Sequence, residues 1–192
     1  MSKPLKFPRF IAICGNPKSG KSLAQEILST DLNYLPIDDG HVLREFAVNK
    51  LGLSWDDVQT QEGKKRVTSI LGKDWEHRIL LGEFGNRLEE MFGEHIMPFI
   101  ATRNLYPNAR YSFGSVRKTQ GHFFKEHGGV VIEIMNPMAP PSGNAFDKYD
   151  LSAVDRTIIN DGMLKFDDPQ RARAYFRGEL LSAIDALAKE RS

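Results

Sequence analysis

The sequence is poor in cysteine, in net charge and in long apolar runs, and each shortage excludes a class of protein. Cys14 is the single cysteine, so no disulfide forms within the chain, as is typical of proteins in a reducing cytosol. No run of about 18 apolar residues occurs, and we therefore expect neither membrane insertion nor export. The 26 basic and 25 acidic side chains give a formal net charge of +1, so any contact with nucleic acid must be local. Together these shortages predict a cytoplasmic protein.

The length and the apolar content of the chain fit one domain. Its 192 residues are 41% hydrophobic, which is enough for one substantial core. They are too few for two typical domains joined by a linker. We therefore expect a single domain over residues 1–192.

Short apolar runs alternate with helical patterns along the chain. The runs have the length and the β-branched or aromatic content of buried strands. They are Phe10–Cys14, Tyr34–Ile37, Arg110–Phe113, Val130–Met135 and Arg156–Ile159. The helical patterns include Ser22–Leu28, His41–Leu51, Asp74–Ile100, Lys118–His127 and Gln170–Lys189. This alternation predicts an α/β fold, a three-layer sandwich around a five-stranded, mainly parallel sheet.

Residues 15–22 carry the strongest chemical signal. The pattern G-x-x-x-x-G-K-S follows the first predicted strand directly and leads into a helix, which is the context of a phosphate-binding loop. The eight residues are Gly15, Asn16, Pro17, Lys18, Ser19, Gly20, Lys21 and Ser22. Their glycines let backbone N–H groups turn inward around phosphates, and the helix N-terminus adds its positive dipole end. The pattern predicts ATP binding, with Lys21 neutralising the β- and γ-phosphates and Ser22 binding Mg²⁺.

Two aspartates follow the second predicted strand, at the same sheet edge as the phosphate loop. Phosphoryl transfer requires an acidic group near the metal ion and the attacking oxygen. We therefore expect Asp38 or Asp39 to act as general base, and Asp39 is also a candidate Mg²⁺ ligand. The alternative is structural, with Asp39 and Gly40 in a turn and Asp38 capping a helix.

Polar residues also follow the third and fifth predicted strands. Arg117 is a candidate clamp on the donor or acceptor phosphate, because a guanidinium group binds phosphate oxygens bidentately. A surface arginine at a helix start is its alternative. Asn160 and Asp161 are candidates for contact with the adenine ring, although such residues also form ordinary capped turns. For Glu133, inside the fourth strand, a structural role is favoured.

A loose tract rich in proline follows the fourth predicted strand. Because it begins at the carboxyl edge of the sheet, where ligands bind in open α/β folds, residues 136–150 are a candidate lid over bound nucleotide. An ordinary surface excursion explains the same composition.

An ordered set of segments supports a family resemblance. The segments are Gly15–Ser22, Leu80–Gly85, Val116–Arg117, Gly128–Ile132 and Ile158–Leu164. Taken together they resemble the phage deoxynucleoside monophosphate kinase family, a branch of the P-loop kinases, over most of the chain. The resemblance implies a P-loop kinase that uses ATP and Mg²⁺, in the host cytoplasm if a phage encodes it.

The departures from this family lie on the acceptor side. Ser115 stands where such kinases have an acidic residue two before the arginine, and Gln120-Gly121 replaces a glutamate that follows. Pro140–Asn144 lacks the family's His and its Ser-Glu or Thr-Glu pair. The phosphate loop ends in Lys-Ser where the family often has Lys-Asp. The donor chemistry is thus kept and the acceptor chemistry is altered.

With these departures, the chain resembles a related phage group more closely. That group is described as phosphorylating the hydroxymethyl group of 5-hydroxymethyluracil in DNA, a step in thymine hypermodification. We therefore expect hydroxymethylated DNA as the acceptor, with a deoxynucleoside monophosphate as the alternative. A nucleotide-binding or ATPase module without kinase activity is the third reading. A DNA acceptor would be bound through local basic residues, for which Lys64–Arg66, Arg171, Arg173 and Arg177 are candidates.

Overall fold

The structure, a computed structural model, describes residues 7–141, 143 and 147–191. Its chain divides into two compact units. The first, here called the sheet unit, runs up to Asp38 and resumes at Asn104. The second, here called the inserted unit, is Asp39–Arg103. The single domain predicted from the sequence stays a prediction, because compactness does not show whether the two units unfold together.

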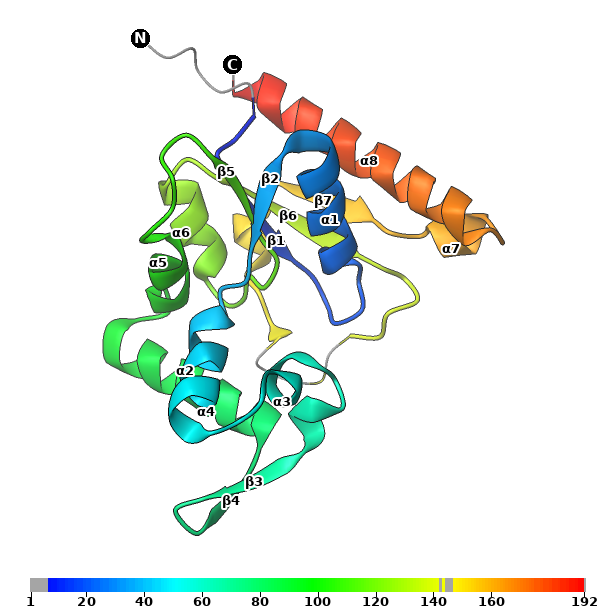
Figure 1. Cartoon of the computed structure of the whole chain (residues 1–192). Helices are drawn as coiled ribbons and strands as arrows, with labels where there is room; N and C mark the ends of the chain where they lie inside the picture. Colours follow the sequence, from blue (N-terminus) through cyan, green and yellow to red (C-terminus); the bar gives the residue numbers. More distant parts are fainter. Residues whose placement is uncertain (1–6, 142, 144–146, 192) are drawn as a thin grey trace. The chain divides into compact units, whose positions relative to one another are not determined.

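The sheet unit is built on a five-stranded sheet in the order β2-β5-β1-β6-β7 (Figure 1). Its strands are β1 (Phe10–Cys14), β2 (Tyr34–Ile37), β5 (Arg110–Phe113), β6 (Val130–Met135) and β7 (Arg156–Ile159). Each begins and ends at the predicted residues, and every pairing between neighbours is parallel. The predicted α/β fold is confirmed, and the carboxyl ends of the strands lie along one edge.

Helices cover both faces of this sheet and complete the three layers. α1 (Lys21–Leu32) and α8 (Pro169–Glu190) pack on one face, over the larger apolar core. α6 (Gln120–Glu126) packs on the other face, where the ring centroids of Phe113 and Phe124 are 4.5 Å apart. Each layer therefore buries an apolar face that would otherwise meet water.

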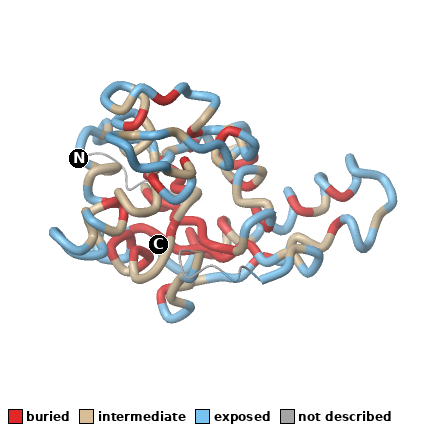
Figure 2. The backbone as a smooth tube through the Cα atoms, turned by 90° about the horizontal axis from the view of Figure 1, so that it is seen from below, coloured by how far each residue is buried: buried red, intermediate tan, exposed pale blue. Residues whose placement is uncertain are grey.

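Strand β1 shows why the apolar runs form the centre. All of its residues are buried, and Figure 2 marks the buried parts of the backbone in red. Ile11 and Ile13 join the core under α1 and α8, whereas the Phe10 ring meets that of Phe124 edge-on at 6.4 Å on the α6 side. Because successive strand side chains point to opposite faces, an uninterrupted apolar strand needs a helical layer on each side.

The helix ends of the sheet unit follow local signals. The Asp168 carboxylate accepts a hydrogen bond from the Gln170 N–H at 2.9 Å, and Pro169 opens α8. Gly128, with a φ of +73°, follows α6 and prevents the helix from continuing. α1 and α8 extend beyond their predicted bounds and α6 is shorter. The short elements η3 (Leu151–Ala153) and α7 (Gly162–Lys165) were not predicted.

The inserted unit contains helices and one small hairpin. Its elements are α2 (His41–Leu51), α3 (Trp55–Gln59), η1 (Gly63–Lys65), β3 (Val67–Ile70), β4 (Lys73–Glu76), α4 (His77–Phe92) and α5 (Ile96–Thr102). The prediction of α2 is confirmed to the residue. The prediction of one helical stretch over Asp74–Ile100 is wrong at its start, where β4 lies. The helical stretch is also interrupted between α4 and α5.

Two turns explain that correction. β4 pairs antiparallel with β3, and the connecting residues Leu71 and Gly72 have φ angles of +52° and +78°, the left-handed conformation of a tight hairpin. Gly93, with a φ of +91°, ends α4 before α5 starts. Leu71 is an unfavourable residue for such a turn, which is why the hairpin was not apparent in the sequence.

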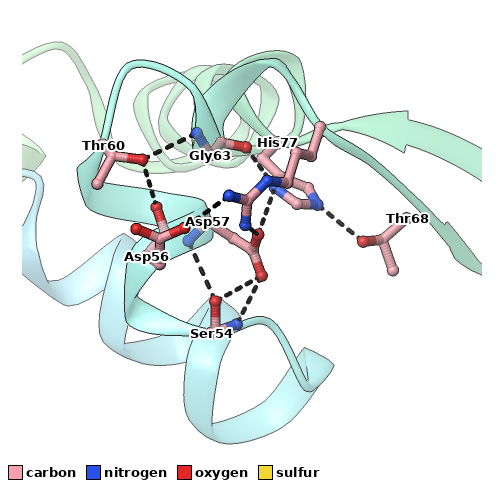
Figure 3. A network of polar contacts seen from close by, with 8 residues as sticks. Ser54, Asp56, Asp57, Thr60, Gly63, Thr68 and His77 are labelled. Carbon is pink, nitrogen blue, oxygen red and sulfur yellow. Dashed lines mark hydrogen bonds and ion pairs between the residues drawn. The ribbon is translucent and has the colours of Figure 1, made fainter.

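A polar network joins four elements of the inserted unit (Figure 3). Ser54 and Asp57 form a reciprocal capping box at the start of α3. Arg66 contacts Asp57 at 2.9 Å. The buried His77 ring contacts the Gly63 carbonyl oxygen at 2.9 Å through Nδ1 and the Thr68 hydroxyl at 2.7 Å through Nε2. The network ties α3 and η1 to the hairpin and α4.

Candidate phosphate-binding site

The phosphate loop turns sharply between β1 and α1. Gly15 and Gly20 have φ angles of +140° and +111°, and Lys18 has a φ of +64°. A Cβ atom on Gly15 would lie 2.3 Å from the Ile134 carbonyl oxygen, and one on Gly20 would lie 2.4 Å from the Asn160 amide nitrogen. Both positions therefore require glycine, for conformation and for space.

Lys21 folds its ammonium group over the loop. Its Nζ donates to the carbonyl oxygens of Gly15 at 2.6 Å and Asn16 at 2.9 Å. Burial lowers the pKa of Lys21 from its usual range, the Asp147 carboxylate opposes the shift, and Arg117 adds to it. Asp147 and Arg117 therefore both contribute to the electrostatic field at Lys21.

The N-terminus of α1 supplies further groups suited to phosphate. Gly20 is its N-cap residue and provides no side-chain cap, so the first N–H groups of the helix have no intrahelical partner. Such N–H groups, with the positive end of the helix dipole, are donors for an anion. Ser22 lies in the first turn with an exposed side chain. In the described part of the chain, the buried Ser19 hydroxyl has no hydrogen-bond partner.

Two asparagines support the loop from outside. Asn160 Nδ2 donates to the Ser19 carbonyl oxygen at 2.9 Å, and Asn136 Nδ2 contacts the Lys18 carbonyl oxygen at 3.5 Å. Because the C=O and N–H of a trans peptide point in opposite directions, the Asn160 contact fixes the direction of the Gly20 N–H. Sequence reasoning missed this supporting role, because nothing in the chain order shows that β7 ends beside the loop.

The predicted adenine contacts lie on this same turn. The Asn160 side chain already donates to the loop, and Asp161 contacts Lys165 Nζ at 3.1 Å at the start of α7. Asp161 is the N-cap residue of α7, but its side chain makes no capping hydrogen bond. A contact of Asn160 or Asp161 with the adenine ring stays a prediction.

Asp38 and Asp39 fall in different units of the chain. Asp38 is exposed just past the end of β2, and one strand, β5, separates β2 from β1. Gln25 of α1 holds that end of the strand, since its Nε2 donates to the carbonyl oxygens of Ile37 at 3.3 Å and Ser112 at 3.0 Å. Asp39 is 8% exposed and begins the inserted unit, in a turn with Gly40. Gly40 is the N-cap residue of α2, so Asp38 is not the helix cap.

Arg117 lies where the sequence predicted, just past β5. Its backbone N–H donates to the Gln120 side-chain oxygen at 3.0 Å, and Gln120 is buried. Gln120, one of the departures from the kinase family that the sequence resembles, therefore shapes the turn that carries Arg117. Arg117 as a whole is partly buried, and its charge contributes to the electrostatic field at Lys21.

Glu133 has the structural role that was favoured. It is 5% exposed, and its two carboxylate oxygens accept hydrogen bonds from Tyr149 at 2.6 Å and Thr157 at 2.7 Å. Burial, and then this carboxylate, raise the pKa of the neighbouring Cys14 thiol to about 12. Among the described residues, no group of three or more His, Cys, Asp or Glu side chains is placed to hold a metal ion.

The basic residues proposed for DNA contact are largely engaged in ion pairs. Arg173 contacts Glu26 at 2.7 Å and Arg177 contacts Asp31 at 2.7 Å, both between α8 and α1. Arg66 contacts both Asp56 and Asp57 in the inserted unit. These pairings argue against the expectation that the three arginines bind backbone phosphates, because each would have to exchange a carboxylate for a phosphate.

Comparisons with known proteins add little beyond the fold. No protein-family model and no curated protein matches the chain. Among solved structures, the chain is similar to a dephospho-CoA kinase from Campylobacter jejuni, with 17% identity and a TM-score of 0.45 over 94% of this chain and 98% of that one. It is also similar to a gluconokinase from Sinorhizobium meliloti 1021, with 14% identity and a TM-score of 0.44 over 97% of each chain. Both are kinases by name, but at this distance neither carries an argument.

The remaining predictions concern the membrane and the lid. None of the helices in the described residues is both long enough and apolar enough to cross a membrane. Of the candidate lid, residues 142 and 144–146 lie outside the described residues, so the lid stays a prediction.

Proposed function

We propose that this chain is an ATP-dependent kinase that transfers the γ-phosphoryl group of ATP to a nucleotide-related acceptor. The observation that carries the proposal is the phosphate loop. Two glycines that tolerate no side chain, a helix N-terminus and the Lys21 ammonium group converge at the end of the central strand. Their shared property is affinity for several phosphate oxygens at once.

The residues present fit ATP and Mg²⁺. The loop N–H groups and Lys21 would hold the β- and γ-phosphates, because an ammonium group has three donor hydrogens and can keep a backbone contact while it binds phosphate. The exposed Ser22 hydroxyl would hold Mg²⁺. When bound, Mg²⁺ supplies neutralisation of the charge on the transferring phosphates.

The reaction needs the acceptor oxygen in line with the leaving ADP. The acceptor oxygen forms a bond to the γ-phosphorus while the bond from that phosphorus to the β–γ bridging oxygen breaks, and ADP leaves with the electron pair. A hydroxyl acceptor also loses a proton, for which Asp38 and Asp39 are the candidate bases. Arg117 is the candidate clamp for the transferring phosphate.

The preferred acceptor remains the hydroxymethyl group of 5-hydroxymethyluracil in DNA. Support comes from the acidic residues that the chain lacks on the acceptor side. Above all, Ser115, after β5, stands where the family that the sequence resembles has an acid. The structure adds an observation in favour of the alternative, a deoxynucleoside monophosphate. Because Arg173, Arg177 and Arg66 are paired with carboxylates, the chain offers less free basic surface for a DNA backbone than its sequence suggests.

Incubation with γ-labelled ATP and separate acceptors tests the proposal. The acceptors are a panel of deoxynucleoside monophosphates, ordinary DNA and DNA containing hydroxymethyluracil. We expect label in the hydroxymethylated DNA alone; label in a monophosphate would select the alternative acceptor. Label released only as inorganic phosphate would overturn the kinase proposal in favour of an ATPase.

Lys21→Ala shows whether the assigned loop performs the transfer. The variant should remain folded and lose activity by about 10²-fold or more, because Lys21 stabilises transferring charge and lies outside the apolar core. Lys189→Ala is the matched control, since Lys189 is exposed near the end of α8. Near-normal turnover of Lys21→Ala at saturating ATP would show that another site is responsible.

A further inference from the structure

One face of α4 borders a groove within the inserted unit. The groove has a volume of about 590 Å³ and is formed by residues of β4 and α4. Trp75 lines it from β4, whereas Leu80, Phe84 and Leu88 line it from α4. An apolar hollow of this kind on a protein surface marks a place where another molecule binds.

A stripe of four α4 residues runs along the same groove. Ile79, Glu83, Arg87 and Met91 all line the groove, and because they are spaced four residues apart they form one row on the helix surface. Ile79 and Met91, at the two ends of the row, are 53% and 73% exposed. The α4 stripe therefore reads apolar, acidic, basic, apolar over a length of about 18 Å.

This order of side chains is complementary to its own reverse. A two-fold axis at the level of Gly85 would place Glu83 opposite Arg87 of a second copy, and Ile79 opposite Met91. Each charged contact then joins opposite signs, and each end contact joins two apolar side chains. Rows of this spacing pack along each other when the two helix axes cross at about 50°, the commonest class of helix packing in globular proteins.

The charged residues of the α4 stripe can take part in such a contact. Within its own chain, Arg87 contacts Glu90 at 2.6 Å, and these two side chains are 70% and 60% exposed. A guanidinium group has five N–H donors, so Arg87 can keep this contact and bind a second carboxylate. An ion pair that a partner covers is also screened less by salt than the exposed pair with Glu90.

The charge of the inserted unit favours a protein over a nucleic acid as the occupant of the groove. Its residues, Asp39–Arg103, include nine basic and eleven acidic side chains. A unit with this balance has no excess of positive charge to attract a polyanion. The α4 stripe itself has one acid and one base, so it fits a partner with the same two charges in reverse order.

We propose that the α4 stripe pairs with the α4 stripe of a second copy of this chain and forms a two-fold symmetric dimer. Two contacts between Glu83 and Arg87 lie at its centre, and two contacts between Ile79 and Met91 cover the exposed apolar ends. The dimer goes beyond the proposed function and does not depend on it.

Charge reversal in the full chain tests this pairing by analytical ultracentrifugation. Wild-type protein at roughly 50 μM should sediment as a dimer, because an interface with a micromolar Kd is populated there. Glu83→Arg and Arg87→Glu each create two contacts between like charges, so each should weaken the dimer by at least about tenfold. An equal mixture of these two variants should form dimers again, because every charged contact between the two different chains then joins opposite signs. Lys189→Glu is the matched control, since Lys189 belongs to an exposed pair of the same spacing on α8, and it should stay dimeric.

The mixture separates pairing between chains from effects within one helix. Each chain in the mixture keeps two like charges on its own α4, so only contact between chains restores the dimer. Far-UV circular dichroism of each variant shows whether the fold is intact. A monomeric wild-type protein would overturn the inference and leave the groove to a partner of another kind. A dimer that persists in both variants would mean that the interface lies elsewhere, and a mixture that stays monomeric would overturn the pairing of Glu83 with Arg87.

Discussion

The two units of the chain are stabilised in different ways. In the sheet unit, strands β1, β6 and β7 and helices α1 and α8 share one large core of fully or nearly fully buried side chains. In the inserted unit, the buried core cluster consists of Ala47, Leu53, Val58 and Leu80, surrounded by partly buried residues. The polar network around Asp57 and His77 adds directional contacts to this smaller core.

The difference extends to the surface. Many of the exposed large apolar residues belong to the inserted unit, among them Phe46, Trp55, Leu71, Met91 and Phe92. A unit with fewer buried apolar contacts opens locally at lower free energy. The candidate phosphate loop lies on the better packed unit, which holds the loop in place. Three predictions test this contrast, the first on ATP binding and the other two on stability, with the smallest expected effect last.

Gly20→Ala should have the largest effect on function, a loss of ATP affinity. The new Cβ would lie 2.4 Å from the Asn160 amide nitrogen, and the φ of +111° is strained for alanine. Strain of about 1–3 kcal/mol at such a position, relieved by a shift of the loop, corresponds to a loss of affinity of roughly ten- to hundredfold. Titration with ATP measures the effect.

Gly178→Ala is the matched control for that substitution. Gly178 is exposed within α8, and nothing lies within 4 Å of the Cβ that alanine would add. Helix propensity should raise the free energy of unfolding by about 0.5–1 kcal/mol and leave ATP affinity unchanged. Equal ATP affinity for Gly20→Ala and wild type would mean that the loop does not bind phosphates in the conformation described here.

Matched leucine truncations compare the two cores. Leu180 is 0% exposed in the sheet unit, and Leu53 is 4% exposed in the inserted unit. Each Leu→Ala change should cost about 2–5 kcal/mol of unfolding free energy, with Leu180 nearer the upper end because its surroundings are more rigid. Both tryptophans, Trp55 and Trp75, lie in the inserted unit, so their fluorescence reports on that unit alone.

Tryptophan fluorescence and far-UV circular dichroism together show whether the two units unfold separately. Leu53→Ala should lower the midpoint of the fluorescence transition more than that of far-UV circular dichroism, which follows both units. Coincident transitions in both variants would contradict this expectation. They would instead support the single cooperative domain predicted from the sequence.

How far the sequence predicted the structure also differs between the units. The five strands of the sheet unit were predicted to the residue, because short runs of apolar and β-branched residues mark them in the sequence. Burial is complete in β1, whereas β2 and β7 at the edges of the sheet are partly exposed. The hairpin in the inserted unit was missed, because its turn uses Leu71 and its strands are exposed or only partly buried. Local patterns therefore sufficed for the sheet and failed for the hairpin, which depends on tertiary contacts.

The candidate site shows the same limit. The phosphate loop is local in sequence, so its glycines, lysine and helix start were all recognised. Other residues act on the site across long sequence separations. Asn160 contacts Ser19, and Gln25 contacts the ends of β2 and β5. Asp147 contributes to the electrostatic field at Lys21. No spacing rule connects such residues.

The smallest expected effect is a pH dependence that belongs to the inserted unit. Asp57 accepts hydrogen bonds from the Ser54 hydroxyl at 2.7 Å and the Ser54 N–H at 2.9 Å, and a further one from Arg66 at 2.9 Å. These contacts, those of Ser54 first, lower the pKa of Asp57 from 3.8 to about 2. Because the folded state favours the charged carboxylate, its contribution to the free energy of unfolding is present above pH 4 and is lost as the pH falls toward 2.

Asp57→Asn should therefore cost about 1 kcal/mol at neutral pH and much less near pH 2, measured by urea unfolding with tryptophan fluorescence. His77 Nδ1 lies 3.8 Å from the same carboxylate, so the comparison is made as a difference between variant and wild type at each pH. A difference that stays constant from pH 7 to pH 2 would show that the charge of Asp57 does not stabilise the unit.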